Sequence, residues 1–173
     1  MGKLISKQSV LFGFLLVAFI IVFEIVLARL KLPAWPAFMV MIFFFVVHED
    51  AKLTPNILIG GLTGILCVIL IKKFIVALEP FIGAEVAKLL FIGLFVYSIV
   101  LLKDAIPWVF NSFAFMFFLV AALAGQAPNP NPSIWMGVEL IVGGIFIAGI
   151  LGINKVVAAV LNGGGEADHH GNP

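Results

Sequence analysis

Long apolar runs, separated by short polar or proline-containing breaks, fill most of the chain. These runs predict helices at about residues 10–30, 37–47, 55–78, 85–102, 109–123 and 134–160. A helix needs roughly 20 mainly apolar residues to cross a bilayer, and most of the runs are long enough. The run at 37–47 is on the short side for a span. The pattern predicts an all-α, polytopic membrane protein with about six transmembrane helices.

The second half of the chain repeats the first half at one constant spacing. In each half an apolar run ends at a basic residue, Arg29 or Lys103, and a proline, Pro33 or Pro107, then precedes the next run. Identical residues pair at the same spacing: Ile25 with Ile99, Val26 with Val100, Leu27 with Leu101, Phe43 with Phe117, Phe44 with Phe118, and Val46 with Val120. We interpret this pattern as an internal duplication.

The duplication divides the chain into residues 1–79, residues 80–162 and a flexible polar tail at 163–173. Pro80 is expected to break the chain between the halves. Each half holds three helices, and an odd number of crossings makes the second half enter the membrane from the opposite side. The prediction is two inverted three-helix repeats, with broken helices at Pro33, Pro36 and Pro107, an arrangement common in transporters and channels.

The composition agrees with a lipid environment and narrows the range of partners. Of 173 residues, 63% are hydrophobic and 11% are charged, and the mean hydropathy is +1.24. A soluble domain of this size has no means of burying so much apolar surface. The net charge of +1 gives no indication of a nucleic-acid partner. The first run lacks a small-residue cleavage site, so we expect a retained span rather than a signal peptide.

Two acidic residues within apolar runs are candidates for a solute site. Glu24 lies near the end of the first helix, and its counterpart in the repeat is Ser98. Charged groups at depth in a membrane are costly and usually face a cavity or a partner. If this pair is functional, both side chains should face a central cavity, where a proton shared with Glu24 couples to solute movement. Glu139 is the second candidate, and for both acids an interfacial position is the alternative.

The proline-bounded starts of the second and fifth helices form another candidate site. Trp35 and Phe38 begin one helix, and Trp108, Asn111 and Ser112 begin the other. Broken helices within a membrane occur where they line a cavity or are buried in protein. Their free amide ends carry partial positive charge, and Asn111 and Ser112 add hydrogen-bonding groups. The alternative is a pair of ordinary interfacial helix starts anchored by tryptophan.

Phenylalanine and glycine are concentrated in particular helices. The phenylalanines of the second and fifth helices, residues 43–45 and 117–118 among them, either form a constriction for small neutral solutes or simply pack. Glycines in the third and sixth helices permit close helix approach within or between subunits. They are Gly60, Gly61, Gly64, Gly143, Gly144 and Gly149. We therefore expect a homo-oligomer.

The chain offers little that suits catalysis, a metal or a cofactor. His48, Glu49 and Asp50 are able to bind metal, but their spacing matches no specific site, and a solvated loop is the favoured interpretation. The acidic and histidine residues at 168–170 lie in the tail, which fixes no geometry. The single cysteine, Cys67, has no partner for an intramolecular disulfide. Since hydrolase, metalloprotease and phosphate-binding motifs are also absent, we predict no enzyme, no metal and no cofactor.

The chain resembles a family of small bacterial inner-membrane proteins known as domain of unknown function 1097. The resemblance lies in Trp35-Pro36-Ala37-Phe38, in Gly60-Gly61-Leu62-Thr63-Gly64 and in Val109-Phe110-Asn111-Ser112-Phe113. It implies a location in a bacterial inner membrane and supplies no activity and no site residues. The proline loop at 126–133 carries no charge, which favours an outer position for that loop and an amino terminus in the cytoplasm.

The predicted function is the passage of a small solute across a bacterial inner membrane, by a channel or small transporter. The inverted repeat, the broken helices and the few buried charges favour this interpretation. Two alternatives stay open, a substrate-binding membrane subunit of a larger importer and a structural or assembly subunit without transport activity. The expected partners are the lipid bilayer, the small-molecule solute and further copies of the chain.

Overall fold

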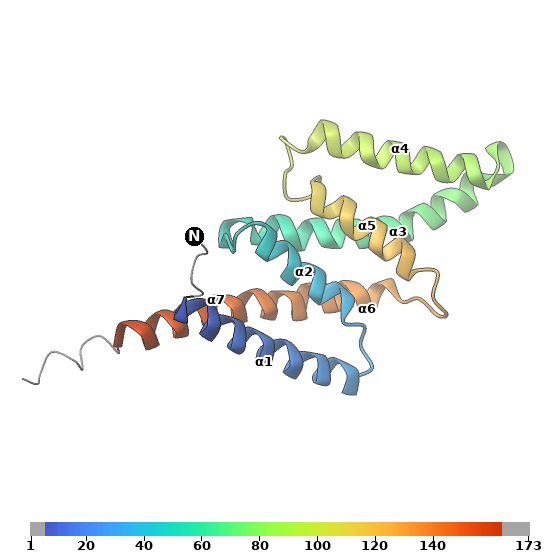
Figure 1. The fold of residues 1–173 in the computed structure, drawn as a ribbon. Coiled ribbons are helices and arrows are strands. Elements are labelled where there is room, and N and C mark those ends of the chain that lie inside the picture. The colour runs from blue at the N-terminus through green and yellow to red at the C-terminus, as the bar shows by residue number, and fades with distance from the viewer. Residues whose placement is uncertain (1–5, 164–173) are drawn as a thin grey trace, which may run out of the picture.

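The computed structural model describes residues 6–163, which form helices joined by short turns (Figure 1). The elements are α1 (Lys7–Arg29), α2 (Trp35–Val46), the 3₁₀ helix η1 (Ala51–Leu53), α3 (Thr54–Ile82), α4 (Ala84–Leu102), α5 (Ser112–Ala124), α6 (Pro132–Gly137), the π-helical segment η2 (Val138–Val142) and α7 (Gly143–Gly163). This part of the chain contains no strand, which confirms the all-α prediction. The polar tail beyond Gly163 lies outside the described residues.

Four helical segments are long and apolar enough to cross a membrane. They are Lys7–Arg29, Ala51–Ile82, Ala84–Leu102 and Pro132–Leu161. The helices α2 and α5 are also apolar but contain only 12 and 13 residues. At a rise of 1.5 Å per residue they are about 18–20 Å long, which is less than a hydrocarbon core of roughly 30 Å. The fold is therefore that of a membrane protein with four long candidate spans and two shorter apolar helices, and six full spans are not confirmed.

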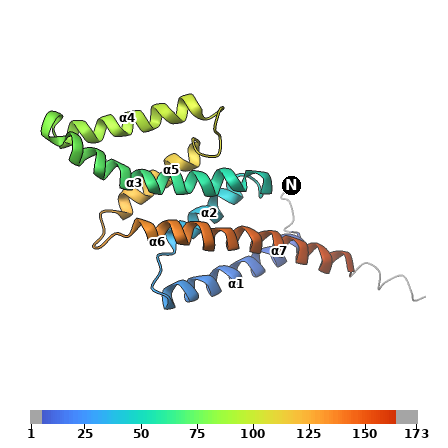
Figure 2. The same ribbon diagram turned by 180° about the vertical axis from the view of Figure 1, so that it is seen from behind.

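The helices are arranged so that each long helix contacts helices of the opposite half. In both views α1 and α4 lie on opposite outer sides, with the remaining helices between them (Figures 1 and 2). α3 packs against α4 and α5, whereas α7 packs against α1 and α2. α1, α3 and α5 run in one direction, and α2, α4 and α6–α7 run in the other (Figure 1). The two halves are therefore interlocked rather than placed side by side.

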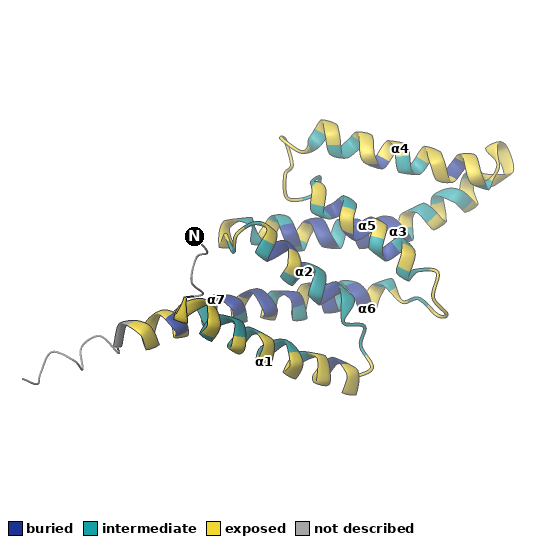
Figure 3. Ribbon diagram, viewed as in Figure 1, coloured by how far each residue is buried: buried dark blue, intermediate teal, exposed yellow. Residues whose placement is uncertain are grey.

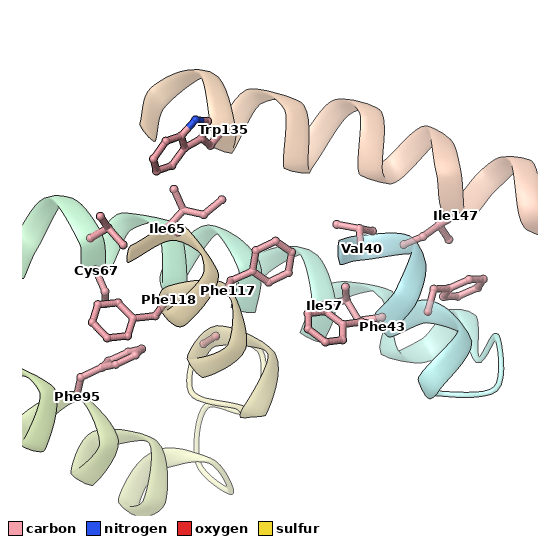
Figure 4. Close-up of a cluster of buried hydrophobic side chains, with 14 of the residues drawn as sticks. Val40, Phe43, Ile57, Ile65, Cys67, Phe95, Phe117, Phe118, Trp135 and Ile147 are labelled. Atoms are coloured by element: carbon pink, nitrogen blue, oxygen red, sulfur yellow. The ribbon is translucent and has the colours of Figure 1, made fainter. Parts of the chain in front are cut away.

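The buried core lies where the short helices α2 and α5 cross the long ones. Dark-blue buried positions concentrate on α2, α3, α5 and α6–α7, while α1 and α4 are largely exposed (Figure 3). Phe44 and Phe117 are fully buried, and the Phe43 ring lies 5.1 Å from that of Phe113 and 5.6 Å from that of Phe117 (Figure 4). The phenylalanines therefore fill the interior by packing against one another. The exposed apolar faces of α1 and α4 suit contact with lipid.

The connection between the two halves differs from the prediction. α3 continues through Pro80 to Ile82, and the chain turns at Gly83, which has a φ of +78°. Proline disrupts a helix by removing one amide donor and crowding the preceding turn, but Pro80 lies in the final turn, where few bonds remain to be lost. Glycine adopts the positive φ without steric strain. The break between the halves is therefore at Gly83 and not at Pro80.

Candidate functional site

Glu139 is the one charged residue that is buried within residues 6–163, with 0% of its surface exposed. It lies in η2, where the backbone changes from α- to π-helical between α6 and α7. Neither carboxylate oxygen has a hydrogen-bond partner among the described residues. A buried carboxyl group without a partner is energetically unfavourable, and π-helical segments within α-helices are frequent at functional sites. The sequence had named Glu139 as a candidate, and the structure places its side chain inside the helix bundle rather than on the protein surface.

The Glu139 carboxyl group occupies space that glycine leaves free on α3. A Cβ atom added at Gly61 would lie 2.5 Å from Glu139 Oε1 and 2.9 Å from the ring of Phe117. Phe117 belongs to α5 and contacts Phe43 of α2. The carboxyl group is therefore enclosed by elements of both halves, close to the crossing of the two short helices.

A cavity of about 510 Å³ opens at one end of the bundle, between the α1–α2 turn and the α5–α6 loop. We call it the vestibule. Its walls include Lys31, Pro33, Trp35, Asn129, Asn131 and Trp135. The rings of Trp35 and Trp135 meet edge to face with centroids 5.4 Å apart. Trp135 is buried and precedes Glu139 by one helical turn, a rise of about 6 Å. The buried carboxyl group therefore belongs to a residue one helical turn away from the vestibule wall.

At the opposite end of the bundle, a group of hydrogen bonds is centred on Asn111. Asn111 Nδ2 donates to the carbonyl oxygens of Asn56 at 2.9 Å, Pro107 at 2.8 Å and Trp108 at 3.3 Å. Asn56 Nδ2 also donates to the Pro107 carbonyl oxygen at 3.3 Å. We call the contacts among Asn56, Pro107 and Asn111 the latch. The latch joins the start of α3 to the loop before α5.

Asn111 also sets the point at which α5 begins. Its Oδ1 accepts a hydrogen bond from the Ala114 amide at 2.9 Å, so Asn111 is the N-cap and the helix starts at Ser112. The sequence predicted that this helix begins at about residue 109, which is wrong because α5 begins at Ser112. The physical reason is that a capping side chain fixes the start of a helix, whereas an apolar run marks it only approximately.

Replacing Asn111 with alanine is expected to lower the free energy of unfolding by about 1–2 kcal/mol, because the cap and the latch are both lost. Replacing it with serine retains a capping oxygen but is too short for the latch, so we expect a smaller loss. Chemical unfolding in mixed micelles measures both variants. Equal stability of wild type and Asn111→Ala would contradict the assignment of Asn111 as cap and latch.

The structure does not bring Glu24 and Ser98 together. Glu24 is exposed on α1, and Ser98 is half-buried on α4, with its hydroxyl donating to the Leu94 carbonyl oxygen at 2.8 Å. Because α1 and α4 lie on opposite outer sides, the expectation that both side chains face one central cavity is wrong (Figures 1 and 2). The pairing of Glu24 with Ser98 at the repeat spacing did not require the two side chains to lie close together.

The other predicted residues are distributed over several environments. Trp35 lines the vestibule. Phe38 packs on Phe146 at 5.5 Å, which makes it a packing residue. Trp108 is 56% exposed and Ser112 is also exposed, so neither lies in an enclosed site. Of the predicted site residues, only Trp35, Asn111 and Glu139 lie in the vestibule, the latch or the buried carboxyl site.

No site role was predicted from the sequence for Trp135 or Asn56, and Gly61 was named only as a packing residue. Trp135 carries a usable signal, since it stands one helical turn before Glu139 on the same face. Gly61 was noted for close helix approach, and the structure shows that the side chain it accommodates is a carboxyl group. Asn56 has no local signal, because its partner is distant in sequence.

Glu49 and Asp50, which follow α2, take part in hydrogen bonds. The Glu49 carboxylate accepts a hydrogen bond from the Asn154 amide, and Asp50 Oδ1 accepts one from the Lys52 amide at 2.9 Å. Within residues 6–163, no three His, Cys, Asp or Glu side chains are grouped closely enough to hold a metal ion. Residues 168–170 lie outside the described part of the chain.

Comparison with known proteins gives no information about the function of the chain. No family model, no curated protein and no solved structure matches the chain. The resemblance to domain of unknown function 1097 therefore stays a prediction.

Proposed function

We propose that this protein moves a small solute across a bacterial inner membrane, as a channel or small transporter in which Glu139 is the central polar group. The observation that carries the proposal is the burial of an unpartnered carboxyl group between the two halves. Ionisable residues within a membrane are expensive and mark pathways for substrates and ions. A single positive charge, brought by a proton or by a cationic group of the solute, would supply the partner that Glu139 lacks.

The two halves form inverted repeats in this proposal. Two observations support the inverted repeat. α3 contacts α4 and α5 in the same way that α7 contacts α1 and α2, and equivalent helices run in opposite directions. At the repeat spacing, Gly61 corresponds to Trp135, and Ile65 corresponds to Glu139. The packing of Gly61 against Glu139 therefore has its equivalent in the packing of Trp135 against Ile65 (Figure 4). Phe43 and Phe117 are equivalent residues and contact each other. A solute path between inverted halves is the general arrangement of many transporters.

The proposal also assigns a direction to the vestibule. Gln8 and Ser9, at the start of α1, line a small cavity together with Glu49 and Asn154, so the amino-terminal end lies with the latch and away from the vestibule. With the amino terminus in the cytoplasm, the vestibule faces the outside. Lipid, the solute and further copies of the chain are the proposed partners, and the exposed apolar faces of α1 and α4 are available for lipid or for another copy.

The test is osmotic swelling of vesicles reconstituted with the purified protein. Glycerol, ethanolamine and methanesulfonate serve as neutral, cationic and anionic probes, and light scattering reports the rate of entry. We expect at least one probe to enter faster than into protein-free vesicles, and the Glu139→Gln variant to abolish the increase. Equal rates with and without protein for all three probes would refute the proposal. Purification from native membrane in a stable complex with other proteins would then favour an importer subunit or an assembly subunit.

A further inference from the structure

We propose that the vestibule is the mouth through which Glu139 is reached, and that the latch holds the equivalent mouth of the other half shut. This inference rests on Glu139 being the central group of the proposed function. It assigns the ligand entering the vestibule a positive charge, carried by a proton or by a small cation.

The path from the vestibule to Glu139 is short. Trp135 is part of the vestibule wall, and Glu139 follows it by one helical turn on the same face. Within residues 6–163, the edge-to-face contact of Trp35 with Trp135 is the aromatic pair that joins the start of α2 to α6. The faces of these indole rings are suited to a passing cation, because they carry negative charge density. In this inference, a cation passes the Trp35–Trp135 pair to reach the carboxyl group.

The two ends of the bundle differ at equivalent positions. At the repeat spacing, the counterpart of Asn111 is Ala37, and the counterpart of Pro107 is Pro33. Asn111 connects the Pro107 carbonyl oxygen to that of Asn56. Ala37 has no polar atoms in its side chain, so the same connection is absent near Pro33, where the vestibule opens. Asn56, the other amide of the latch, corresponds to Pro130, so both amide side chains of the latch are missing at the vestibule end.

Cysteine accessibility tests the sidedness of this path. Cys67 is the only cysteine of the chain, so Cys67→Ala provides a background for single cysteines. Asn129→Cys marks the vestibule face and Lys52→Cys the latch face. Glu139→Cys reports the site, and Leu140→Cys is a matched control because Leu140 is an exposed neighbour on the apolar surface. The probe is 2-(trimethylammonium)ethyl methanethiosulfonate, a cation that does not cross membranes, added to one face at a time and followed by intact mass.

We expect Glu139→Cys to react from the face that labels Asn129→Cys and to be protected from the face that labels Lys52→Cys. Adding Asn111→Ser, which keeps the helix cap, should raise the reaction rate from the latch face about tenfold or more, since several hydrogen bonds are removed. Leu140→Cys should react from neither face. Reaction of Glu139→Cys from neither face, from both equally, or from the latch face alone would overturn the inference, as would no effect of Asn111→Ser.

A second measurement uses the wild-type chain, so it does not depend on whether the Glu139→Cys variant folds. A cationic water-soluble carbodiimide added from the vestibule face should modify Glu139, as detected by peptide mass, and the same reagent added from the latch face should not. The outcomes also separate the two proposals. If Glu139 reacts from the vestibule face only but no solute enters the vesicles, the proposed function is refuted and the inference about the vestibule stands. If solute enters but Glu139 shows no sidedness of reaction, only the inference about the vestibule is refuted.

Discussion

Replacing Gly64 with alanine is expected to lower the free energy of unfolding by about 3 kcal/mol, at the upper end of the range for overpacked cores. A Cβ atom at this position would meet the Ala114 carbonyl oxygen and lie 2.7 Å from the Phe118 amide nitrogen. Both atoms belong to the backbone of α5, so no side-chain rotation relieves the contact. The closest helix pair of the core, α3 with α5, must separate instead.

Gly93→Ala is the matched control for this experiment. Gly93 is also a helical glycine, on α4, and a Cβ atom added there meets nothing within 4 Å. Alanine at this position should leave stability unchanged or raise it by about 0.5–1 kcal/mol, because glycine is a poor helix former. Unfolding in mixed micelles compares the two variants. Equal effects of both substitutions would show that α3 and α5 are not in backbone contact.

Replacing Glu139 with leucine is expected to have opposite effects on stability and on function. Leucine has a similar volume and removes a buried polar group with no partner, so the free energy of unfolding should rise by about 1–3 kcal/mol. The same change removes the proposed partner for positive charge, so solute entry into vesicles should be lost. A gain of stability together with a loss of activity is typical of a functional group kept at an energetic cost.

Two further variants make the Glu139 experiment decisive. Glu139→Gln keeps the shape without the charge and should also lose solute entry, with a smaller change in stability. Glu85→Gln, at an exposed acid on the first turn of α4, should change neither property. If Glu139→Leu instead destabilises the protein, the carboxyl group contributes to the stability of the fold and is not kept at an energetic cost.

The sequence predicted the elements of the fold better than their packing. Apolar runs and prolines located the helices to within a few residues, since a bilayer demands long apolar segments. They did not reveal which helices pack together, because a helix that is apolar on every side gives no indication of its buried face. This is why Glu24 and Ser98 were expected at a common cavity, although α1 and α4 are the two outermost helices.

The candidate site was also predicted only in part, because much of it depends on packing between residues that are distant in sequence. An acid in an apolar run is visible in the sequence, and so Glu139 was identified. Its burial depends on Gly61, far away in the chain, and its π-helical setting depends on packing that no local pattern encodes. The latch also joins distant residues, Asn56 and Asn111, so only the folded arrangement reveals it.

An open vestibule at one end has a consequence for the electric field across the membrane. Water that fills the vestibule brings the potential of that aqueous phase close to Trp135, so most of the voltage drop falls between Glu139 and the latch face. One elementary charge that crosses the full potential gains or loses about 2.3 kcal/mol per 100 mV. In the proposed function, a cation that reaches Glu139 from the vestibule therefore senses little of the voltage, while its release past Asn111 senses most of it. Release of the cation past the latch, rather than its entry, is then the voltage-dependent step.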